Sequence, residues 1–263
     1  MKIALGQLQV SETWQANLQM IEKVGEQSAD AGARLLVLPE GIIARDPADP
    51  SLPQRTAQPL DGPFVSGLCE LSSRTGLAIS GTVHVPADNE RAHNVHIVID
   101  HGSVIASYVK LHLYDAFTSR ESDHVAPGKT VPPLVTIDDF RFGLMTCYDV
   151  RFPELARAHA MAGADALLLP AAWVRGSLKE EHWQLMVSAR AVENTVYVLG
   201  VGEVSERNIG RSIAVDPLGV TVAAAAEQPA LIFTTIDRQR LDEARRSLPV
   251  LANARFAGPV LRR

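Results

Sequence analysis

The chain has 263 residues, of which 46% are hydrophobic and 21% are charged. This composition is typical of a folded globular protein, and α/β chains of this size commonly form one domain. The formal net charge is -5 and the basic residues are scattered along the sequence, so we expect no nucleic acid as a partner.

The lengths of the apolar runs and the spacing of the cysteines indicate in which cellular compartment the protein is expected. In the first segment, MKIALGQLQV, Gln7 and Gln9 interrupt the apolar run too early for a secretory signal. No uninterrupted apolar run reaches the roughly eighteen residues of a membrane span. Cys69 and Cys147 lack a CxxC spacing, which indicates neither a disulfide framework nor a zinc ribbon. We therefore expect a cytoplasmic protein with reduced thiols and no membrane partner.

The N-terminal half is predicted to alternate strands and helices. A strand at 1–10 is followed by a helix that begins at a Ser11 N-cap and ends at Gly32, and then by a buried strand, RLLVLPE. A second helix carries Phe64, Leu68 and Leu71 and ends at Gly76. Three strands follow, LAISGTVHV, NVHIVID and SVIASYVK, and a short HG turn predicts a hairpin between the last two.

The C-terminal half begins with an aperiodic segment, residues 111–133, whose length suggests a functional loop. Helices are predicted at 153–162, 178–194 and 239–246. Strands are predicted at RFGLMTC, DALLLPAAW, TVYVLGVG, RSIAVD, VTVAAA and ALIFTTID. No repeat or linker interrupts the pattern, which predicts a single α/β domain over residues 1–263.

Three polar residues come directly after apolar strand segments: Glu40, Lys110 and Cys147. In α/β proteins such positions line the crevice that binds ligands. Each residue also has a structural interpretation. Cys147 could be a small buried hydrophobe, Lys110 a surface charge and Glu40 a solvated turn residue. Cys69 lies on a helical pattern and is interpreted as packing.

The three residue types together favour acyl transfer by a thiol. A thiol is mostly protonated at neutral pH and needs a base or a positive neighbour to become a nucleophile, and Glu40 could be that base. The oxyanion needs fixed donors, for which Lys110 and the backbone N–H of Tyr148 are the candidates. The Lys110 charge is also expected to stabilise the thiolate of Cys147, so that this cysteine is alkylated faster than Cys69.

Four segments, VLPE at 37–40, YVKLHLYD at 108–115, TCYDVRFPELAR at 146–157 and GRSIAVDPLG at 210–219, resemble the signature segments of the nitrilase superfamily of carbon-nitrogen hydrolases. More narrowly, KLHLYDAF, LMTCYDVRFPELA and LPAAWVRG are similar to the bacterial deaminated glutathione amidases, relatives of the omega-amidases.

The resemblance implies a fold and a reaction. It implies a four-layer α-β-β-α sandwich, a homodimer of two sandwiches with the tail at 247–263 in the dimer contacts, and a triad of Glu40, Lys110 and Cys147. Glu121, in the loop segment TSRESDHVAPG, would position the lysine or the substrate, although it could be a solvated loop acid. The implied reaction hydrolyses a linear carboxamide through a thioester, with deaminated glutathione yielding 2-oxoglutarate and cysteinylglycine.

The substrate is expected to be a small amide that carries a carboxylate. Tyr114, Arg151, Trp173 and Arg175 lie in segments near the predicted triad. A buried carboxylate needs a basic partner, and Arg175 is the first choice. Arg151 could equally be a structural ion-pair partner, and Trp173 a wall of the pocket.

Other interpretations remain open at this stage. His93 and His96 lie on a predicted strand where their spacing points them to opposite faces, and no HExxH motif occurs, so we expect no metal and no cofactor. His112 and His182 could be structural. An omega-amidase or an N-carbamoyl amino acid hydrolase is possible within the superfamily. A non-catalytic scaffold would be expected to lack one of the four polar residues, and a thiol oxidoreductase would need a resolving cysteine.

Overall fold

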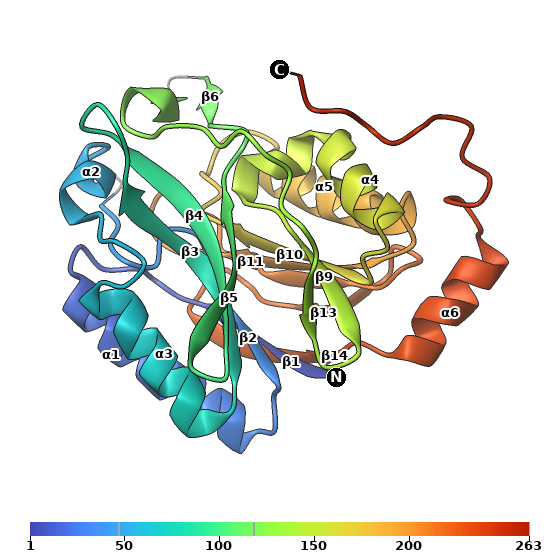
Figure 1. Ribbon diagram of the computed structural model, residues 1–263, viewed down its shortest axis with the longest axis horizontal. Helices are drawn as coiled ribbons and strands as arrows, with labels where there is room; N and C mark the ends of the chain where they lie inside the picture. The colour runs from blue at the N-terminus through green and yellow to red at the C-terminus, as the bar shows by residue number, and fades with distance from the viewer. Residues whose placement is uncertain (47, 118, 263) are drawn as a thin grey trace.

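The computed structural model describes residues 1–46, 48–117 and 119–262. Two six-stranded sheets lie face to face, and helices cover the outer face of each (Figure 1). The helices α1 (Trp14–Asp30) and α3 (Pro63–Thr75) cover one outer face, and α4 (Pro153–Met161) and α5 (Lys179–Val192) cover the other. The predicted four-layer α-β-β-α sandwich is therefore confirmed.

The first sheet has the strand order β14-β1-β2-β3-β4-β5. Its three central strands β1, β2 and β3 are parallel, and the flanking strands pair antiparallel. The antiparallel pairing of β4 with β5 confirms the hairpin predicted at the HG turn. The strands are β1 (Lys2–Gln7), β2 (Leu35–Val37), β3 (Ala78–Pro86), β4 (Ala92–Asp100), β5 (Ser103–Val109) and β14 (Ala230–Thr235).

The second sheet has the order β13-β12-β11-β10-β9-β8, again with a parallel centre, β9, β10 and β11, and antiparallel edges. The strands are β8 (Val135–Ile137), β9 (Phe140–Leu144), β10 (Ala166–Ala171), β11 (Tyr197–Gly202), β12 (Ile213–Val215) and β13 (Thr221–Ala224). Strand β2 lies in the parallel part of the first sheet, and the segment after it supplies Glu40. Strand β9 lies in the parallel part of the second sheet, and the segment after it supplies Cys147.

The core explains why the strand sequences are apolar without interruption. Leu35 and Val37 of β2 belong to the cluster that the two sheets enclose. Leu36 and Leu38 belong to the cluster that the first sheet forms with α1 and α3. Because successive strand residues point to opposite faces, a strand covered on both faces needs apolar residues at every position.

The helix α1 begins later than the sequence predicts. Its N-cap is Thr13, with an extended backbone at φ -116° and ψ 130°, and not Ser11. Ser11 is held in the preceding loop by Asn17, which accepts from the Ser11 N–H at 2.7 Å and donates to the Ser11 carbonyl at 2.9 Å. This tertiary contact fixes the entry of the chain into the helix, which a propensity argument could not anticipate.

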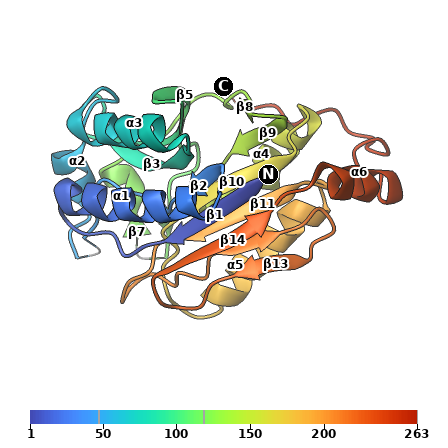
Figure 2. The same cartoon turned by 90° about the horizontal axis from the view of Figure 1, so that it is seen from below.

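The segment predicted as a loop at 111–133 contains elements too short to produce a periodic sequence. They are β6 (Asp115–Ala116), β7 (Ser119–Arg120) and the 3-10 turn η1 (Glu121–Asp123). The remaining elements are α2 (Leu52–Thr56), the 3-10 turn η2 (Cys147–Arg151) and α6 (Arg238–Ser247), which lies at one end of the sandwich (Figure 2). Within the described residues, none of the helices has the length and apolarity needed to cross a membrane.

Candidate active site

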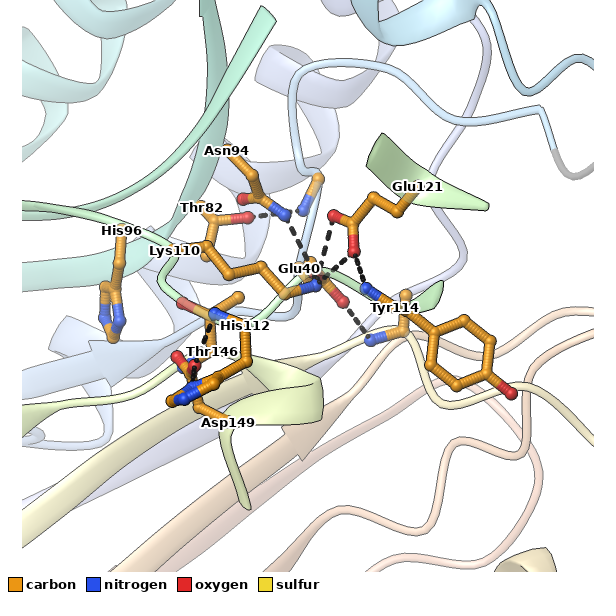
Figure 3. Close-up of polar contacts among 12 residues, drawn as sticks. Glu40, Thr82, Asn94, His96, Lys110, His112, Tyr114, Glu121, Thr146 and Asp149 are labelled. Carbon is orange, nitrogen blue, oxygen red and sulfur yellow. Dashed lines mark hydrogen bonds and ion pairs between the residues drawn. The ribbon is translucent and has the colours of Figure 1, made fainter. Parts of the chain in front are cut away.

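Glu40 follows β2 and is buried, with 4% of its surface exposed. One carboxylate oxygen, Oε1, accepts from Lys110 Nζ at 2.8 Å and from Asn94 Nδ2 at 2.8 Å, and the other accepts from the Ala172 N–H at 2.9 Å (Figure 3). Burial alone would raise the pKa of Glu40, but the charges of Lys110 and Arg45 and the Lys110 hydrogen bond outweigh it and lower the pKa to about 2. The carboxylate is therefore ionised and held in one orientation.

Lys110 follows β5 and is 1% exposed. Its ammonium lies between two carboxylates, Glu40 at 2.8 Å and Glu121 at 2.9 and 3.1 Å (Figure 3). Burial lowers the pKa of Lys110, but the negative charges of Glu121 and Glu40 raise it well above its usual value. Glu121 is held in turn by the Tyr114 N–H, which donates to its Oε2 at 2.6 Å. The structure therefore brings Glu40, Lys110 and Glu121 into one charged cluster.

Cys147 is the first residue of η2 and has a φ of 47°, in the left-handed region that non-glycine residues rarely adopt. The turn that holds it is a capping box, in which Thr146 and Asp149 each accept from the backbone of the other. Such strained backbone persists only where its surroundings fix it, and it occurs often at active sites. Cys147 is 6% exposed, and its thiol contacts the Glu40 carboxylate and the Ala172 N–H.

The protonation state of Cys147 differs from the expectation. Burial raises the pKa of the thiol, the Glu40 charge raises it further, and the Lys110 charge opposes both without reversing them. The prediction of a thiolate stabilised by Lys110 is therefore wrong for the free protein. The thiol keeps its proton, beside a carboxylate that can accept it.

Asp149 is a buried residue that the sequence interpretation missed. Its carboxylate accepts from the Thr146 N–H at 2.9 Å, from the Tyr108 hydroxyl at 2.8 Å and from the His112 ring at 2.7 Å (Figure 3). These contacts fix the Cys147 turn to β5 and to the loop that follows it. The Thr-x-x-Asp spacing across Cys147 is a capping-box pattern, a signal that could have identified Asp149.

A cavity of about 690 Å³ opens over the cluster, and Glu40, Lys110, Glu121 and Cys147 all line it. Two of the four predicted substrate-binding residues, Tyr114 and Trp173, also line it, together with Lys179, which the sequence interpretation did not consider. A cavity of this size is within the usual range for small-molecule sites.

The structure places Arg151 and Arg175 outside the cavity lining. The Arg151 guanidinium lies over the Trp173 ring, 4.8 Å from its centroid, and so stands behind one of the cavity walls. Arg175 pairs with Glu227 at 3.4 Å and is directed toward the surface. Both belong to segments that border the cavity, but their side chains point elsewhere.

His93 and His96 connect neighbouring segments of the fold through hydrogen bonds. His96 lies between the sheets and bonds to Ser80 Oγ at 2.8 Å and to the Met145 carbonyl at 3.0 Å. His93 contacts the Ala126 carbonyl at 3.0 Å. Among the described residues, no group of three or more His, Cys, Asp or Glu side chains is arranged to hold a metal ion.

Comparison with known proteins identifies the family. A family model for carbon-nitrogen hydrolases matches residues 2–246, and the chain belongs to this family. It is 45% identical over 261 residues, 99% of this chain and 100% of the relative, to a protein of Escherichia coli O157:H7 named deaminated glutathione amidase. A human protein of the same name is 33% identical over 272 residues, covering 96% of this chain and 82% of the human protein.

Two solved structures are similar over nearly the whole chain. Saccharomyces cerevisiae Nit3, a member of branch 10 of the nitrilase superfamily, has a TM-score of 0.85 and 29% identity, with 97% of each chain covered. A mutant amidase from Nesterenkonia sp. AN1 in complex with butyramide has a TM-score of 0.82 and 27% identity, with 95% of each chain covered. The chain is thus a carbon-nitrogen hydrolase that acts on amides, and its resemblance to the nitrilase superfamily is confirmed.

Proposed function

We propose that this hydrolase cleaves deaminated glutathione to 2-oxoglutarate and cysteinylglycine through a thioester on Cys147. The observation that carries the mechanism is the convergence of Glu40, Lys110 and Cys147 in one cavity, with Glu121 beside Lys110. The full-length similarity to the E. coli deaminated glutathione amidase supports the substrate.

In the proposed acylation step, the Cys147 sulfur attacks the amide carbonyl carbon while the thiol proton passes to Glu40. Because the pKa of Cys147 is raised and that of Glu40 is about 2, proton transfer before attack is unfavourable. Transfer therefore accompanies formation of the carbon-sulfur bond. Glu40 then delivers the proton to the leaving amine, and the carbon-nitrogen bond breaks to give the thioester and the free amine.

In the proposed hydrolysis step, a water molecule attacks the thioester carbonyl. Glu40 accepts a proton from the water, and the sulfur leaves as Cys147 regains a proton. The products are the carboxylic acid and the original enzyme. One carboxylate thus acts as base and acid in turn, which its fixed orientation between Asn94 and the Ala172 N–H favours.

The negative charge that develops on the substrate oxygen needs donors near Cys147. The Tyr148 N–H stands in the first turn of η2, where helical N–H groups have no partner within the helix. The Lys110 ammonium is the second proposed donor. Glu121 is proposed to act through Lys110, because it holds the ammonium from the side opposite Glu40 and is anchored by the Tyr114 backbone.

We also propose that the substrate carries at least one carboxylate and that the protein acts as a cytoplasmic homodimer. The C-terminal tail at 247–263 lies entirely outside the family match, and beyond Ser247, the last residue of α6, it exposes Phe256 and Val260. Large exposed apolar side chains on a tail favour a contact with a second copy. Sedimentation of the full chain, with and without residues 252–263, tests the dimer.

The substrate is tested with a panel of amides. Purified enzyme is incubated with deaminated glutathione, with omega-amides of keto acids and with N-carbamoyl amino acids, and the acid product is assayed directly. The proposal expects the highest kcat/KM on deaminated glutathione and no turnover with Cys147→Ala. Turnover of another class with none of deaminated glutathione would overturn the proposed substrate.

A further inference from the structure

Lys179 places a second buried ammonium at the cavity. It is the first residue of α5, is 5% exposed and lines the cavity with Cys147. Its Nζ donates to the Tyr114 hydroxyl at 2.8 Å. The ammonium also lies over aromatic rings, with centroids at 4.3 Å for Phe117, 5.1 Å for Tyr114 and 5.6 Å for Trp173.

This ammonium differs from that of Lys110 because no carboxylate among the described residues compensates its charge. Lys110 has two carboxylates within 3.1 Å, whereas no ion pair involves Lys179 among the residues that the structure describes. An ammonium has three N–H donors and the Tyr114 hydroxyl takes one. Burial lowers the pKa of Lys179 and the like charge of Arg151 lowers it further. A buried charge in such surroundings is costly unless a partner arrives.

Three other basic residues near the cavity, Arg120, Arg45 and Arg175, each have a carboxylate nearby. Arg120 pairs with Asp123 at 3.6 Å. Arg45 lines the cavity but acts on the Glu40 carboxylate, whose pKa it lowers. Arg175 is paired with Glu227. Lys179 combines a buried position at the cavity with the absence of an ion pair among the described residues, and both features favour an anionic ligand.

We propose that the Lys179 ammonium binds a carboxylate of the amide substrate. The inference rests on the proposed function, in which Cys147 attacks the amide of a substrate that carries carboxylates. A carboxylate at Lys179 would receive the N–H donors that Tyr114 leaves free and would replace the missing counter-charge. Lys179 is itself buried and the Trp173 ring beside it is 3% exposed, so little water screens the contact, which strengthens it. The substrate class is therefore an amide with an anionic group within reach of both Cys147 and Lys179.

The test uses two matched pairs of amides. The first pair has the charge on the acyl side: the monoamide of glutaric acid and neutral pentanamide. The second has it on the amine side: N-butyrylglycine and N-butyrylmethylamine. For each pair, the ratio of kcat/KM for the anionic to the neutral member is measured in wild type, Lys179→Met and Lys179→Gln. Lys23→Met, at an exposed position on α1, is the matched control for loss of a lysine charge.

We expect wild type to prefer the anionic member of at least one pair. Lys179→Met should lower that ratio roughly ten- to hundredfold, the range for losing a hydrogen bond to a charged group, through a higher KM for the anionic amide. Lys23→Met should keep the ratio. Circular dichroism checks folding, and Lys179→Gln replaces Lys179→Met if the latter unfolds.

Failure of this inference can be told from failure of the proposed function. If wild type hydrolyses amides without preferring either anionic member, or if Lys179→Met and Lys179→Gln keep the preference, the inference is overturned while the amidase mechanism stands. A ratio that falls in Arg45→Met and not in either Lys179 variant would assign the carboxylate to Arg45 and overturn it equally. If wild type hydrolyses neither these amides nor deaminated glutathione, the proposed function itself fails.

Discussion

Replacing Lys110 with Met is expected to affect turnover and stability through one missing charge. The variant loses the proposed second donor to the oxyanion, so kcat should fall on the order of a hundredfold or more. Single-turnover measurement of thioester formation on one amide substrate gives the acylation rate directly. Lys110→Arg should not rescue the rate fully, because a planar guanidinium cannot occupy the compact position between Glu40 and Glu121.

The same substitution leaves two buried carboxylates without their shared partner. Breaking a buried ion pair by removing one member costs about 3–5 kcal/mol. The pKa of Glu40 falls from 4.5 to about 2 in the folded protein. This difference corresponds to about 3 kcal/mol, which gives the scale of the stability that the Glu40 carboxylate loses when Lys110 is removed. Urea unfolding of wild type and Lys110→Met at neutral pH should show a loss of this order.

The pH dependence of that loss follows from the sign of the Glu40 shift. A carboxylate whose pKa is lowered on folding stabilises the protein fully above its unfolded value of 4.5 and loses that contribution as the pH falls toward 2. The difference in unfolding free energy between wild type and Lys110→Met should therefore be largest at neutral pH and shrink below pH 4.5. Lys129→Met, at an exposed position, should show no such difference.

A folded Lys110→Met enzyme that acylates at the wild-type rate would show that the oxyanion is held elsewhere.

The remaining predictions concern the nucleophile and its base. Cys147→Ala and Cys147→Ser should abolish turnover without changing the circular dichroism spectrum, and activity in either would contradict the thioester. Glu40→Gln should lower kcat by a hundredfold or more yet accelerate alkylation of Cys147 by iodoacetamide, because the Glu40 charge helps to raise the pKa of the thiol. Slower labelling in Glu40→Gln would mean that Glu40 supports the thiolate. EDTA should leave kcat unchanged, and activity lost to EDTA but restored by zinc would require a metal.

The positions of Glu40, Lys110 and Cys147 were predictable because each follows an apolar strand segment, and strand ends in α/β folds border a common crevice. That rule depends only on the hydrophobic pattern, which is local in the sequence. The sandwich itself followed from the family resemblance, and the strand order within it was not predictable from the chain alone.

The partners of these residues were not predictable for a physical reason. Asn94 donates to Glu40 from within β4. Ala172 donates through its backbone N–H, and because every residue except proline has such a group, the residue type does not indicate the contact. Arg151 and Arg175 show the reverse error, because they lie in segments that border the cavity while their side chains point away from it. Side-chain direction depends on packing partners that are distant in the chain, so segment proximity alone does not assign a contact.

The charges around Cys147 explain why a buried thiol with a raised pKa is compatible with catalysis. Burial raises the pKa of the Cys147 thiol and the Glu40 charge raises it further, while the positive charge of Lys110 opposes both, so a free thiolate is disfavoured. In the proposed mechanism, the thiol proton moves onto Glu40 and the negative charge moves to the substrate oxygen when the carbonyl is attacked. Lys110 then has one fewer carboxylate to neutralise and can bond the oxyanion. The arrangement therefore stabilises charge on the substrate and not on the resting sulfur, so that reactivity depends on a bound amide.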